Sequence, residues 1–316
     1  VYKRQEVGRG TSTGGKPPTL LELDPEGRFA VGVDLSRRPF EAALLNLRGR
    51  IVARQQGKAL APEGRDAVEE VHRLVTNLIG VAGAPALGIG LAVPGAVSDE
   101  GVVVAAQSLG WRDLDLQSAL EDVYEIPTHV AGDAEAAALA EFGRGGSAAD
   151  ADLLYVKVDD RVTVAIVSRG EIHRASRRGG ELTHLAVAGS FEECSCGRRG
   201  CLGTVASVTA MLGADFAELS SEARTSLGAE TEPDVGPAAR ALGGVLAPII
   251  AAIDIDRVVL GGSLAEWDVV APLVASSVED TLGWAPAVVV SQLRATAAVL
   301  GAGGMVLSAE LGVVWG

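Results

Sequence analysis

The order of the apolar runs is the feature that most limits the fold of this 316-residue chain. Three runs of strand length occur within residues 29–60, followed by helical spacing over 64–80 and a buried strand that ends at Pro94 and Gly95. A second series of the same kind opens with strands at 153–160 and 162–172. Strands that alternate with helices are typical of α/β folds. The sequence therefore predicts two α/β lobes built on one plan.

The boundaries of these lobes follow from the same runs. We expect the first lobe over residues 29–131 and the second over 132–295. A C-terminal helix over 296–312 is a candidate to pack back on the first lobe. Residues 6–28 are rich in Gly, Pro, Ser and Thr and are interpreted as a connector that enters the first strand. Residues 1–5 fit no part of this pattern and are interpreted as a processing or assembly scar.

Composition restricts the class of protein. Apolar residues make up 48% of the chain and charged residues 22%, which is typical of a globular protein with a proper core. No apolar run reaches the length of about 20 residues that a membrane span needs, and no export signal is evident, so we expect a cytoplasmic protein. The formal net charge of −14 opposes binding to phosphate backbones. We expect no DNA binding by this chain alone.

All three cysteines lie within eight residues, at Cys194, Cys196 and Cys201. An odd number of cysteines in a reducing compartment argues against a disulfide framework. With His184 upstream they form a Cys3His set, which is typical of a closed structural zinc site. Glycines at 197 and 200 let the short loop turn so that the sulfurs face one point. The sequence predicts one structural zinc ion per chain; free, inert cysteines are the alternative.

Several motifs resemble those of the ROK family (repressor, open reading frame, kinase). The most specific are "GELTHL" and "CSCGRRGC"; "GIGLAVPGAV", "SLGW", "GDAEAAALAEF" and "VVLGGSL" resemble further family blocks in the same order. The resemblance implies a two-lobed sugar kinase/actin-like (ribonuclease H-like) fold. The opening "TSTGGKPPTLLEL" is similar to the segment that joins the winged helix-turn-helix of the family's repressors to their sensor region. Residues 1–28 are thus expected to be a linker from a missing DNA-binding domain.

The same resemblance implies a sugar pocket. Asp133 corresponds to the general base of the family's kinases, and Glu181 to the residue that holds two sugar hydroxyls. Three polar positions of the family are replaced here, by Ser108, Gly132 and Gly203. Helix capping by Asp133 and a solvated loop carboxylate at Glu181 are the alternative interpretations. The candidate ligand-binding residues are Ser108, Gly132, Asp133, Glu181 and His184.

The turns that bind nucleotide phosphates in such kinases are altered. "DLSRRPF" keeps Asp34 but places Ser36, Arg37 and Pro39 in the first turn, and "VDDRVTVAI" places Asp159 and Asp160 in the second. Carboxylates here oppose the electrostatic stabilisation that phosphoryl transfer needs. The pair Arg37 and Arg38 is interpreted as a solvated hairpin tip, or else as phosphate binders. "LGGS" at 260–263 fits a tight turn. We expect no ATP binding, no catalytic residue and no enzyme activity.

Three functions remain open. The first is the ligand-sensing and dimerisation region of a ROK-type transcriptional regulator that responds to a sugar or sugar derivative. Its expected partners are that ligand, further copies of itself as a homodimer or dimer of dimers, and DNA only through the missing domain. The second is a ROK-type sugar kinase, which the altered turns disfavour. The third is a zinc-stabilised pseudo-kinase that acts through protein contacts.

Overall fold

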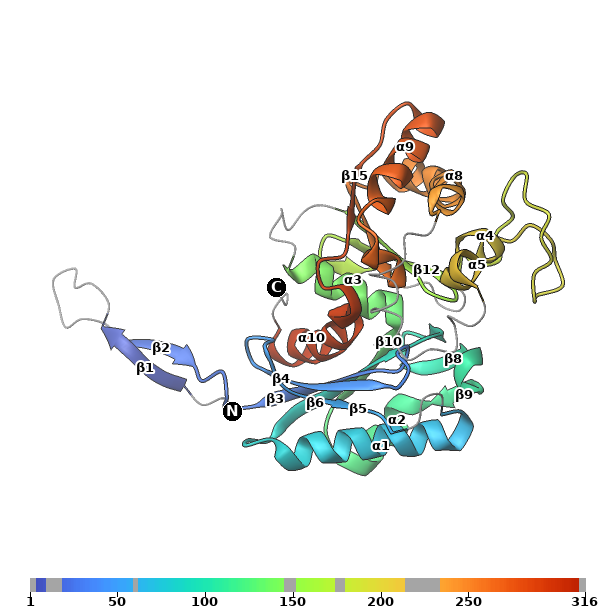
Figure 1. Cartoon of the computed structure of the whole chain (residues 1–316). Coiled ribbons are helices and arrows are strands. Elements are labelled where there is room, and N and C mark those ends of the chain that lie inside the picture. The colour runs from blue at the N-terminus through green and yellow to red at the C-terminus, as the bar shows by residue number, and fades with distance from the viewer. Residues whose placement is uncertain are drawn as a thin grey trace.

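The computed structural model describes residues 4–9, 19–58, 62–144, 152–173, 180–213 and 234–312. Two five-stranded mixed sheets form its framework (Figure 1). In the first sheet three strands form an antiparallel meander and two more extend it in parallel, in the order β10-β6-β3-β4-β5. Its strands are β3 (Phe29–Asp34), β4 (Glu41–Asn46), β5 (Ile51–Gln56), β6 (Ala86–Val93) and β10 (Thr128–Gly132).

The second sheet repeats this plan, with the order β15-β14-β11-β12-β13. Here too an antiparallel meander is extended in parallel beyond its first strand. The shared order confirms the repeat expected from the apolar runs. Its strands are β11 (Leu153–Val158), β12 (Val162–Ser168), β13 (Glu171–Ile172), β14 (Arg257–Gly262) and β15 (Ala287–Val290).

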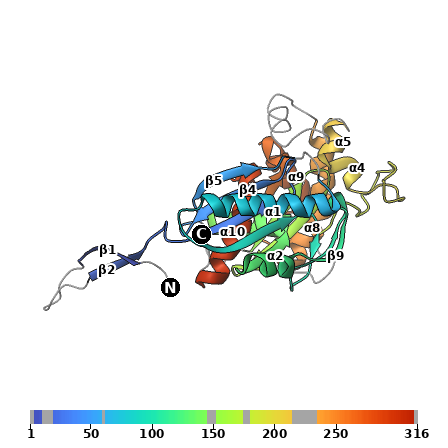
Figure 2. The same ribbon diagram turned by 90° about the horizontal axis from the view of Figure 1, so that it is seen from below.

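Helices alternate with the sheets in layers. Figures 1 and 2 show α1 and α2 on the outer face of the first sheet, α3 and α10 between the sheets, and α8 and α9 on the far side of the second. On α1, apolar residues at helical spacing, among them Val71, Leu74 and Leu78, are buried. The helices are α1 (Gly64–Val81), α2 (Leu116–Tyr124), α3 (Asp133–Arg144), α8 (Gly236–Ile253), α9 (Val270–Leu282) and α10 (Ala297–Leu311).

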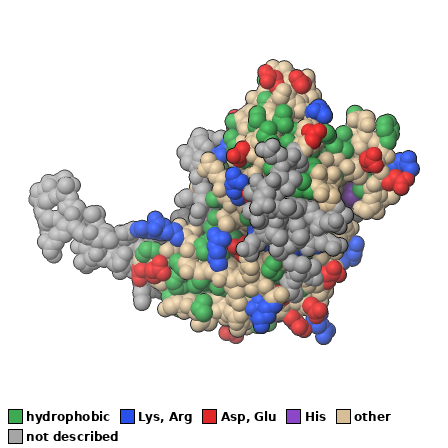
Figure 3. Space-filling view, viewed as in Figure 1, with side chains coloured by type: hydrophobic (Ala, Val, Ile, Leu, Met, Phe, Trp, Pro, Cys, Tyr) green, Lys and Arg blue, Asp and Glu red, His purple; other side chains and the backbone are tan. Residues whose placement is uncertain are grey.

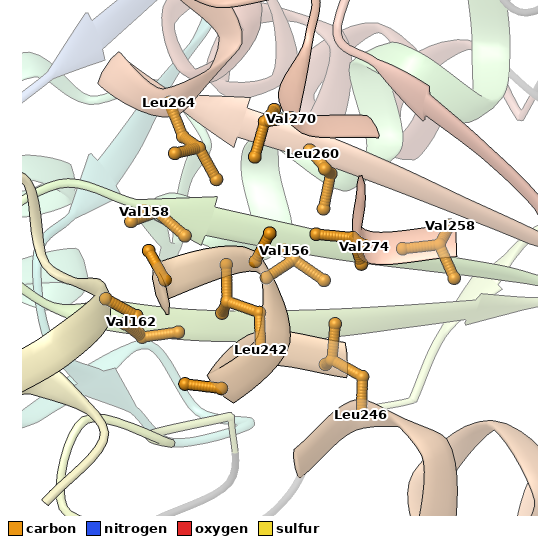
Figure 4. Packing of buried hydrophobic residues seen from close by; sticks show 14 of the residues in the cluster. Val156, Val158, Val162, Leu242, Leu246, Val258, Leu260, Leu264, Val270 and Val274 are labelled. Carbon is orange, nitrogen blue, oxygen red and sulfur yellow. The ribbon is translucent and has the colours of Figure 1, made fainter. Parts of the chain in front are cut away.

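The core of the second half lies between its sheet and its outer helices. Figure 4 shows Leu242 and Leu246 of α8 packed against Val156 of β11 and Leu260 of β14. Among the described helices, α8 alone is long and apolar enough to pass a length-and-composition test for a membrane span. The burial of its apolar residues against α9 and the sheet is what a core helix requires.

The middle layer is unusually close to the first sheet. A Cβ atom on Gly90 of β6 would lie 1.8 Å from the carbonyl oxygen of Ala302 in α10, and one on Gly301 would lie 1.7 Å from that of Ala136 in α3. These glycines permit α10 to contact both β6 and α3. The helix therefore joins the end of the chain to strands near its beginning.

The N-terminal residues differ from the prediction. The expected connector contains two antiparallel strands, β1 (Arg4–Arg9) and β2 (Thr19–Leu23), with Arg4 opposite Leu23. They form a hairpin beside the main body in Figure 1. Residues 4 and 5 are thus part of a regular element. The average composition of residues 6–28 concealed two short strands, because Gly and Pro are concentrated in the segment between them.

Two further differences are local. A three-stranded sheet of β7 (Ala96–Val97), β8 (Val102–Ala106) and β9 (Trp111–Asp115) was not predicted. The run 162–172 is two strands rather than one, because Arg169 and Gly170 both have positive φ and turn the chain between β12 and β13.

Charges of both signs are mixed over the surface. Figure 3 shows Lys and Arg side chains interspersed with Asp and Glu side chains on the face in view. The excess of acidic residues belongs to the chain as a whole.

Candidate ligand cleft and metal centre

A cavity of about 160 Å³ lies where strands of the two sheets end. The carboxyl ends of β3, β6, β11 and β14 all lead into it, which is the usual place for a ligand in α/β folds. Its lining includes Asp34, Arg37, Pro94, Ser108 and Asp133 from the segments before β11, and Tyr155, Lys157, Asp159, Arg161 and Ser263 from β11 onward.

Lys157, next to the carboxyl end of β11, is the central cation of this cleft. Its Nζ lies 2.6 Å from Oδ2 of Asp133 and 2.8 Å from Oδ2 of Asp159. Lys157 is 8% exposed, so burial opposes its charge. The carboxylates of Asp133, Asp159 and Asp34 outweigh that penalty and raise the pKa of the Lys157 ammonium above its ordinary value. The lysine is thus held charged between α3 and the β11–β12 turn.

Asp159 links the same turn to the end of β14. Its Oδ1 accepts hydrogen bonds from the Ser263 backbone N–H, at 2.8 Å, and from the Ser263 hydroxyl, at 2.7 Å. Burial alone would raise the pKa of the Asp159 carboxyl, but the Lys157 ammonium and the Ser263 donors hold it well below its usual range. The negative charge predicted at this turn is therefore present and is neutralised within the protein.

Arg161 joins the second sheet to the first. Its guanidinium donates to the carbonyl oxygen of Pro94 at 2.9 Å and forms an ion pair with Glu181. The segment that carries Glu181 lies beside β12 through a bridge to Thr163. Glu181 also accepts a hydrogen bond from the Thr183 backbone N–H at 3.1 Å. The carboxylate is bonded on both of its oxygens, so it is not the solvated loop carboxylate considered as its alternative.

The first turn is built around Asp34. Its Oδ1 accepts from the backbone N–H and the hydroxyl of Ser36, at 2.8 and 2.7 Å. Burial raises the pKa of Asp34 to about 6, although Lys157 opposes this. Arg37 is not a solvated hairpin tip: it pairs with Glu41 at 2.8 Å and donates to the carbonyl oxygen of Ala295 at 3.0 Å.

Asp133 is the first residue of α3 rather than its cap. Its Oδ1 accepts from the adjacent Ala134 N–H at 3.0 Å, and its Oδ2 faces Lys157. The side chain of Glu135 accepts from the Gly132 N–H at 2.9 Å. Asp133 therefore combines a local backbone contact with a position in the cavity wall.

The remaining predicted ligand-binding residues are placed differently. Ser108 is exposed and lines the cavity. The described lining does not include Gly132, Glu181 or His184; Glu181 reaches it through its partner Arg161. Gly203 leaves no room for a larger residue, because a Cβ there would lie 2.5 Å from Cγ2 of Thr183.

The four expected metal ligands do come together. The nearest ligand atoms of His184, Cys194, Cys196 and Cys201 all lie within 4.8 Å of one another. Nδ1 of His184 is 3.5 Å from the Cys194 Sγ, and the Cys196 and Cys201 Sγ atoms are 3.6 Å apart. Ligands at zinc–sulfur distances of about 2.3 Å in a tetrahedron are separated by roughly 3.8 Å. Two of the ligand pairs are close to this separation, and the four residues form a group that could hold a metal ion.

The loop turns as its glycines predict. Gly197 and Gly200 both have positive φ, and a Cβ on Gly200 would lie 2.3 Å from the carbonyl oxygen of Ser190. The Cys194 backbone N–H donates to the carbonyl oxygen of Arg198 at 2.8 Å. Two short helices, α4 (Gly203–Ala206) and α5 (Val208–Leu212), follow the loop and connect it to the core.

Sequence reasoning missed the two basic residues that organise the cleft, Lys157 and Arg161. A signal for Lys157 was present, because a lysine inside the apolar run "LLYVKV" is rare in a buried strand unless it is paired. Nothing in the sequence pointed to Arg161, whose partner oxygen on Pro94 is 67 residues away.

Comparisons with known proteins agree on one family. The family model described as "ROK family" matches residues 30–309. The chain is 28% identical over 216 residues to the xylose repressor of Bacillus subtilis, covering 66% of this chain and 55% of that repressor. It is 30% identical over 276 residues to the glucokinase of Halalkalibacterium halodurans, covering 76% of this chain and 81% of that enzyme. The chain spans about half the length of the xylose repressors it matches.

Solved structures share the fold. A ROK family transcriptional regulator, described as a homologue of the Escherichia coli MLC protein, superposes with a TM-score of 0.74 at 20% identity, covering 93% of this chain and 82% of that one. The ROK family glucokinase of Streptomyces griseus, in complex with glucose and AMPPNP, gives 0.73 at 21% identity, covering 88% and 98%. With its family match, its duplicated sheets and its Cys3His loop, this chain belongs to the ROK family.

Proposed function

We propose that this chain is the ligand-sensing region of a sugar-responsive ROK regulator and that it transfers no phosphoryl group. One observation carries the proposal: the turns around the cavity are closed by ion pairs and hydrogen bonds among the chain's own side chains. Lys157 holds Asp133 and Asp159, Asp159 holds Ser263, and Arg161 holds Glu181.

These contacts oppose catalysis at Asp133. A general base must lie within hydrogen-bond reach of the proton that it removes. One oxygen of Asp133 is engaged by an ammonium at 2.6 Å and the other by a backbone N–H at 3.0 Å. Phosphoryl transfer also depends on donors that position the phosphates. Here a carboxylate takes up the donors of Ser263.

The cleft is nevertheless suited to a small polar ligand. Ser108 and Pro94 line it from the first half of the chain, and Asp133 and Arg161 add carboxylate and guanidinium groups. A ligand that contacts both halves would bind one arrangement of the lobes better than another, and that difference is what shifts a conformational equilibrium. Thr183 occupies the space beside Gly203, where a Cβ would lie 2.5 Å from its Cγ2.

The names of the relatives support the function of a transcriptional regulator, and one of them also supports that of a sugar kinase. Xylose repressors and the regulator NagC of Escherichia coli are 26–32% identical to this chain, and the name of each describes a repressor or regulator. The glucokinase relative favours the second candidate, an ATP-dependent sugar kinase. Binding of DNA and formation of homodimers are proposals for the whole protein. A pseudo-kinase that acts only by protein contacts would show no sugar binding.

We further propose that the metal of the Cys3His cluster is one structural zinc ion. Three thiolates and one imidazole complete a tetrahedron and leave no position for a reacting water molecule. His184 lies three residues after Glu181, so the ion would fix the segment that carries this carboxylate.

Calorimetric titration of the purified chain with neutral sugars, xylose, glucose and N-acetylglucosamine first, tests the proposal. We expect saturable binding by at least one sugar, and loss of that binding in Glu181→Ala without loss of cooperative unfolding. Because this variant frees Arg161, Glu181→Gln serves as the matched control for packing. A sugar that binds the parent and Glu181→Ala equally would place the ligand elsewhere.

An assay of ATP-dependent sugar phosphorylation separates the two candidates. We expect no turnover with any of these sugars. Steady turnover that disappears in Asp133→Asn would establish the kinase instead.

A further inference from the structure

The Asp159 carboxylate lies in a set of converging donors on the cavity wall. Two donors of Ser263, its backbone N–H and its hydroxyl, reach Oδ1 at 2.8 and 2.7 Å. The Lys157 ammonium reaches Oδ2 at 2.8 Å. All three residues line the cavity. Both oxygens of the carboxylate are therefore bound, Oδ1 by Ser263 at the end of β14 and Oδ2 by Lys157 two residues earlier in the chain.

Such a donor set has a recognisable chemistry. A backbone N–H, a hydroxyl and an ammonium directed at one point bind oxyanions, because each contact to a charged oxygen is about twice as strong as a neutral hydrogen bond. The donors come from β11 and from the residue after β14, strands that are paired in parallel. Their spacing is thus set by the sheet and does not depend on Asp159 alone.

We propose that Asp159 occupies an oxyanion-binding position in the cleft and thereby excludes phosphate and carboxylate groups of ligands, so that the cleft takes uncharged ones. The exclusion is an intramolecular competition. An incoming anion must displace a carboxylate that is tethered beside its donors and is present at a high effective concentration. The choice of an uncharged sugar rests on the proposed function, whereas the oxyanion position does not.

Other cations of the cleft reinforce this selection. The guanidinium of Arg161 pairs with Glu181, that of Arg37 with Glu41 and that of Arg294 with Glu266. An anionic ligand would meet a carboxylate beside each of these three cations. A neutral polyol can hydrogen-bond to the same groups without separating a charge pair.

Removal of the Asp159 carboxylate should leave the donors in place. Lys157 keeps its contact with Asp133 and the attraction of Asp34. Ser263 keeps its position at the end of β14, which is paired with β11 along its length. The Asp159→Ala variant would therefore expose an ammonium, a hydroxyl and a backbone N–H to the cavity.

The experiment measures binding of inorganic phosphate to the full chain by thermal shift and phosphorus NMR, against sodium chloride of matched ionic strength. We expect Asp159→Ala to bind phosphate with a dissociation constant at least about tenfold lower than that of the parent. The matched control is Asp160→Ala, because the Asp160 carboxylate also lines the cavity and accepts from the Thr209 hydroxyl. This control removes a nearby negative charge but leaves Asp159 on its donors, so its gain in phosphate binding should be much smaller than that of Asp159→Ala.

Two results would overturn the proposal. One is a folded Asp159→Ala variant that binds phosphate no better than the parent. The other is an Asp160→Ala variant that binds phosphate as tightly as Asp159→Ala does. If Asp159→Ala does not unfold cooperatively, Asp159→Ser carries the test, because serine suits a turn and is too short to keep the carboxylate's place at the Ser263 donors; a folded Asp159→Ser variant that binds phosphate no better than the parent contradicts the proposal. Addition of Lys157→Met should abolish the gain. No sugar enters this experiment, so its failure is independent of the proposed function.

Discussion

The cleft and the loop over 184–201 each gather several groups that need a cation beside them. The cleft contains its own cation, whereas the loop is suited to one from outside the chain. In the cleft, Asp34, Asp133 and Asp159 surround Lys157, which supplies a cation from within the fold. In the loop over 184–201, three cysteines and one histidine gather in a geometry suited to an external cation.

The difference follows from how each cluster is assembled. The metal ligands lie within 18 residues, and tight turns at two glycines bring them together. The cleft cluster joins segments that are far apart in the chain; Asp34, Asp133 and Lys157 are buried, and Asp159 is partly exposed. A local loop lacks a core of its own and can gain folding free energy from a bound metal. Carboxylates that are buried by the fold need a cation beside them, because an unpaired buried charge is costly.

The largest expected effect is on the loop. Cys196→Ser removes one of the four donors and should abolish stoichiometric metal binding. The variant should also unfold more easily, because structural zinc supplies about 10 kcal/mol or more of folding free energy in small zinc domains. Elemental analysis and the unfolding midpoint, with and without a chelator, measure this. Ser195→Ala, between two of the ligands, is the control and should keep the metal. A parent protein without zinc would remove this half of the comparison.

Loss of the internal cation comes next. Lys157→Ala leaves the buried Asp133 and the partly exposed Asp159 without their ammonium. Breaking a buried pair such as Lys157–Asp133 costs about 3–5 kcal/mol. Urea unfolding of the two proteins measures the difference. Lys58→Ala, at an exposed lysine, should change the unfolding free energy little. An unchanged midpoint for Lys157→Ala would mean that the cleft carboxylates are not held by Lys157.

A pH dependence distinguishes Asp34 from the other two carboxylates. Its pKa of about 6 in the folded state lies above the value of 3.8 for an unperturbed side chain. The folded protein therefore holds this proton more tightly, and its contribution to stability is lost as the pH rises through this window.

In Asp34→Asn that loss is absent, so the variant should gain roughly 2 kcal/mol relative to the parent between about pH 4.5 and pH 7. Denaturant titrations at both pH values test this, and comparison at each pH cancels any titration of the metal ligands. A difference between variant and parent that does not change with pH would contradict the raised pKa.

The smallest effect is expected at the surface of the metal loop. Arg199 forms an ion pair with Glu193, and both side chains are largely exposed. Pairs of this kind contribute about 0–1 kcal/mol, so Arg199→Ala should leave zinc content unchanged and the unfolding free energy within that range. A loss of metal in this variant would show that the pair, and not only the cysteines, shapes the loop.

Local patterns in the sequence were sufficient for much of this structure. Apolar runs predicted β3, β4, β5, α1 and β6 in the first series and opened the second series at β11, because alternation and helical spacing are properties of neighbouring residues. The spacing of the cysteines and glycines likewise predicted that His184 and the three cysteines come together in a group that could hold a metal ion, since all of them lie in one segment. The hairpin of β1 and β2 was missed because its strands are short and are separated by Gly-rich residues.

The tertiary structure alone decided the character of the cleft. Lys157 and Asp133 are 24 residues apart, Asp159 and Ser263 are 104 apart, and their side chains meet only because β11 pairs with β14 and α3 packs beside them. The sequence by itself indicated acidic residues in an altered turn and suggested that they repel phosphate. The fold showed that they are neutralised from within, because the burial that brings carboxylates together also requires a cation beside them.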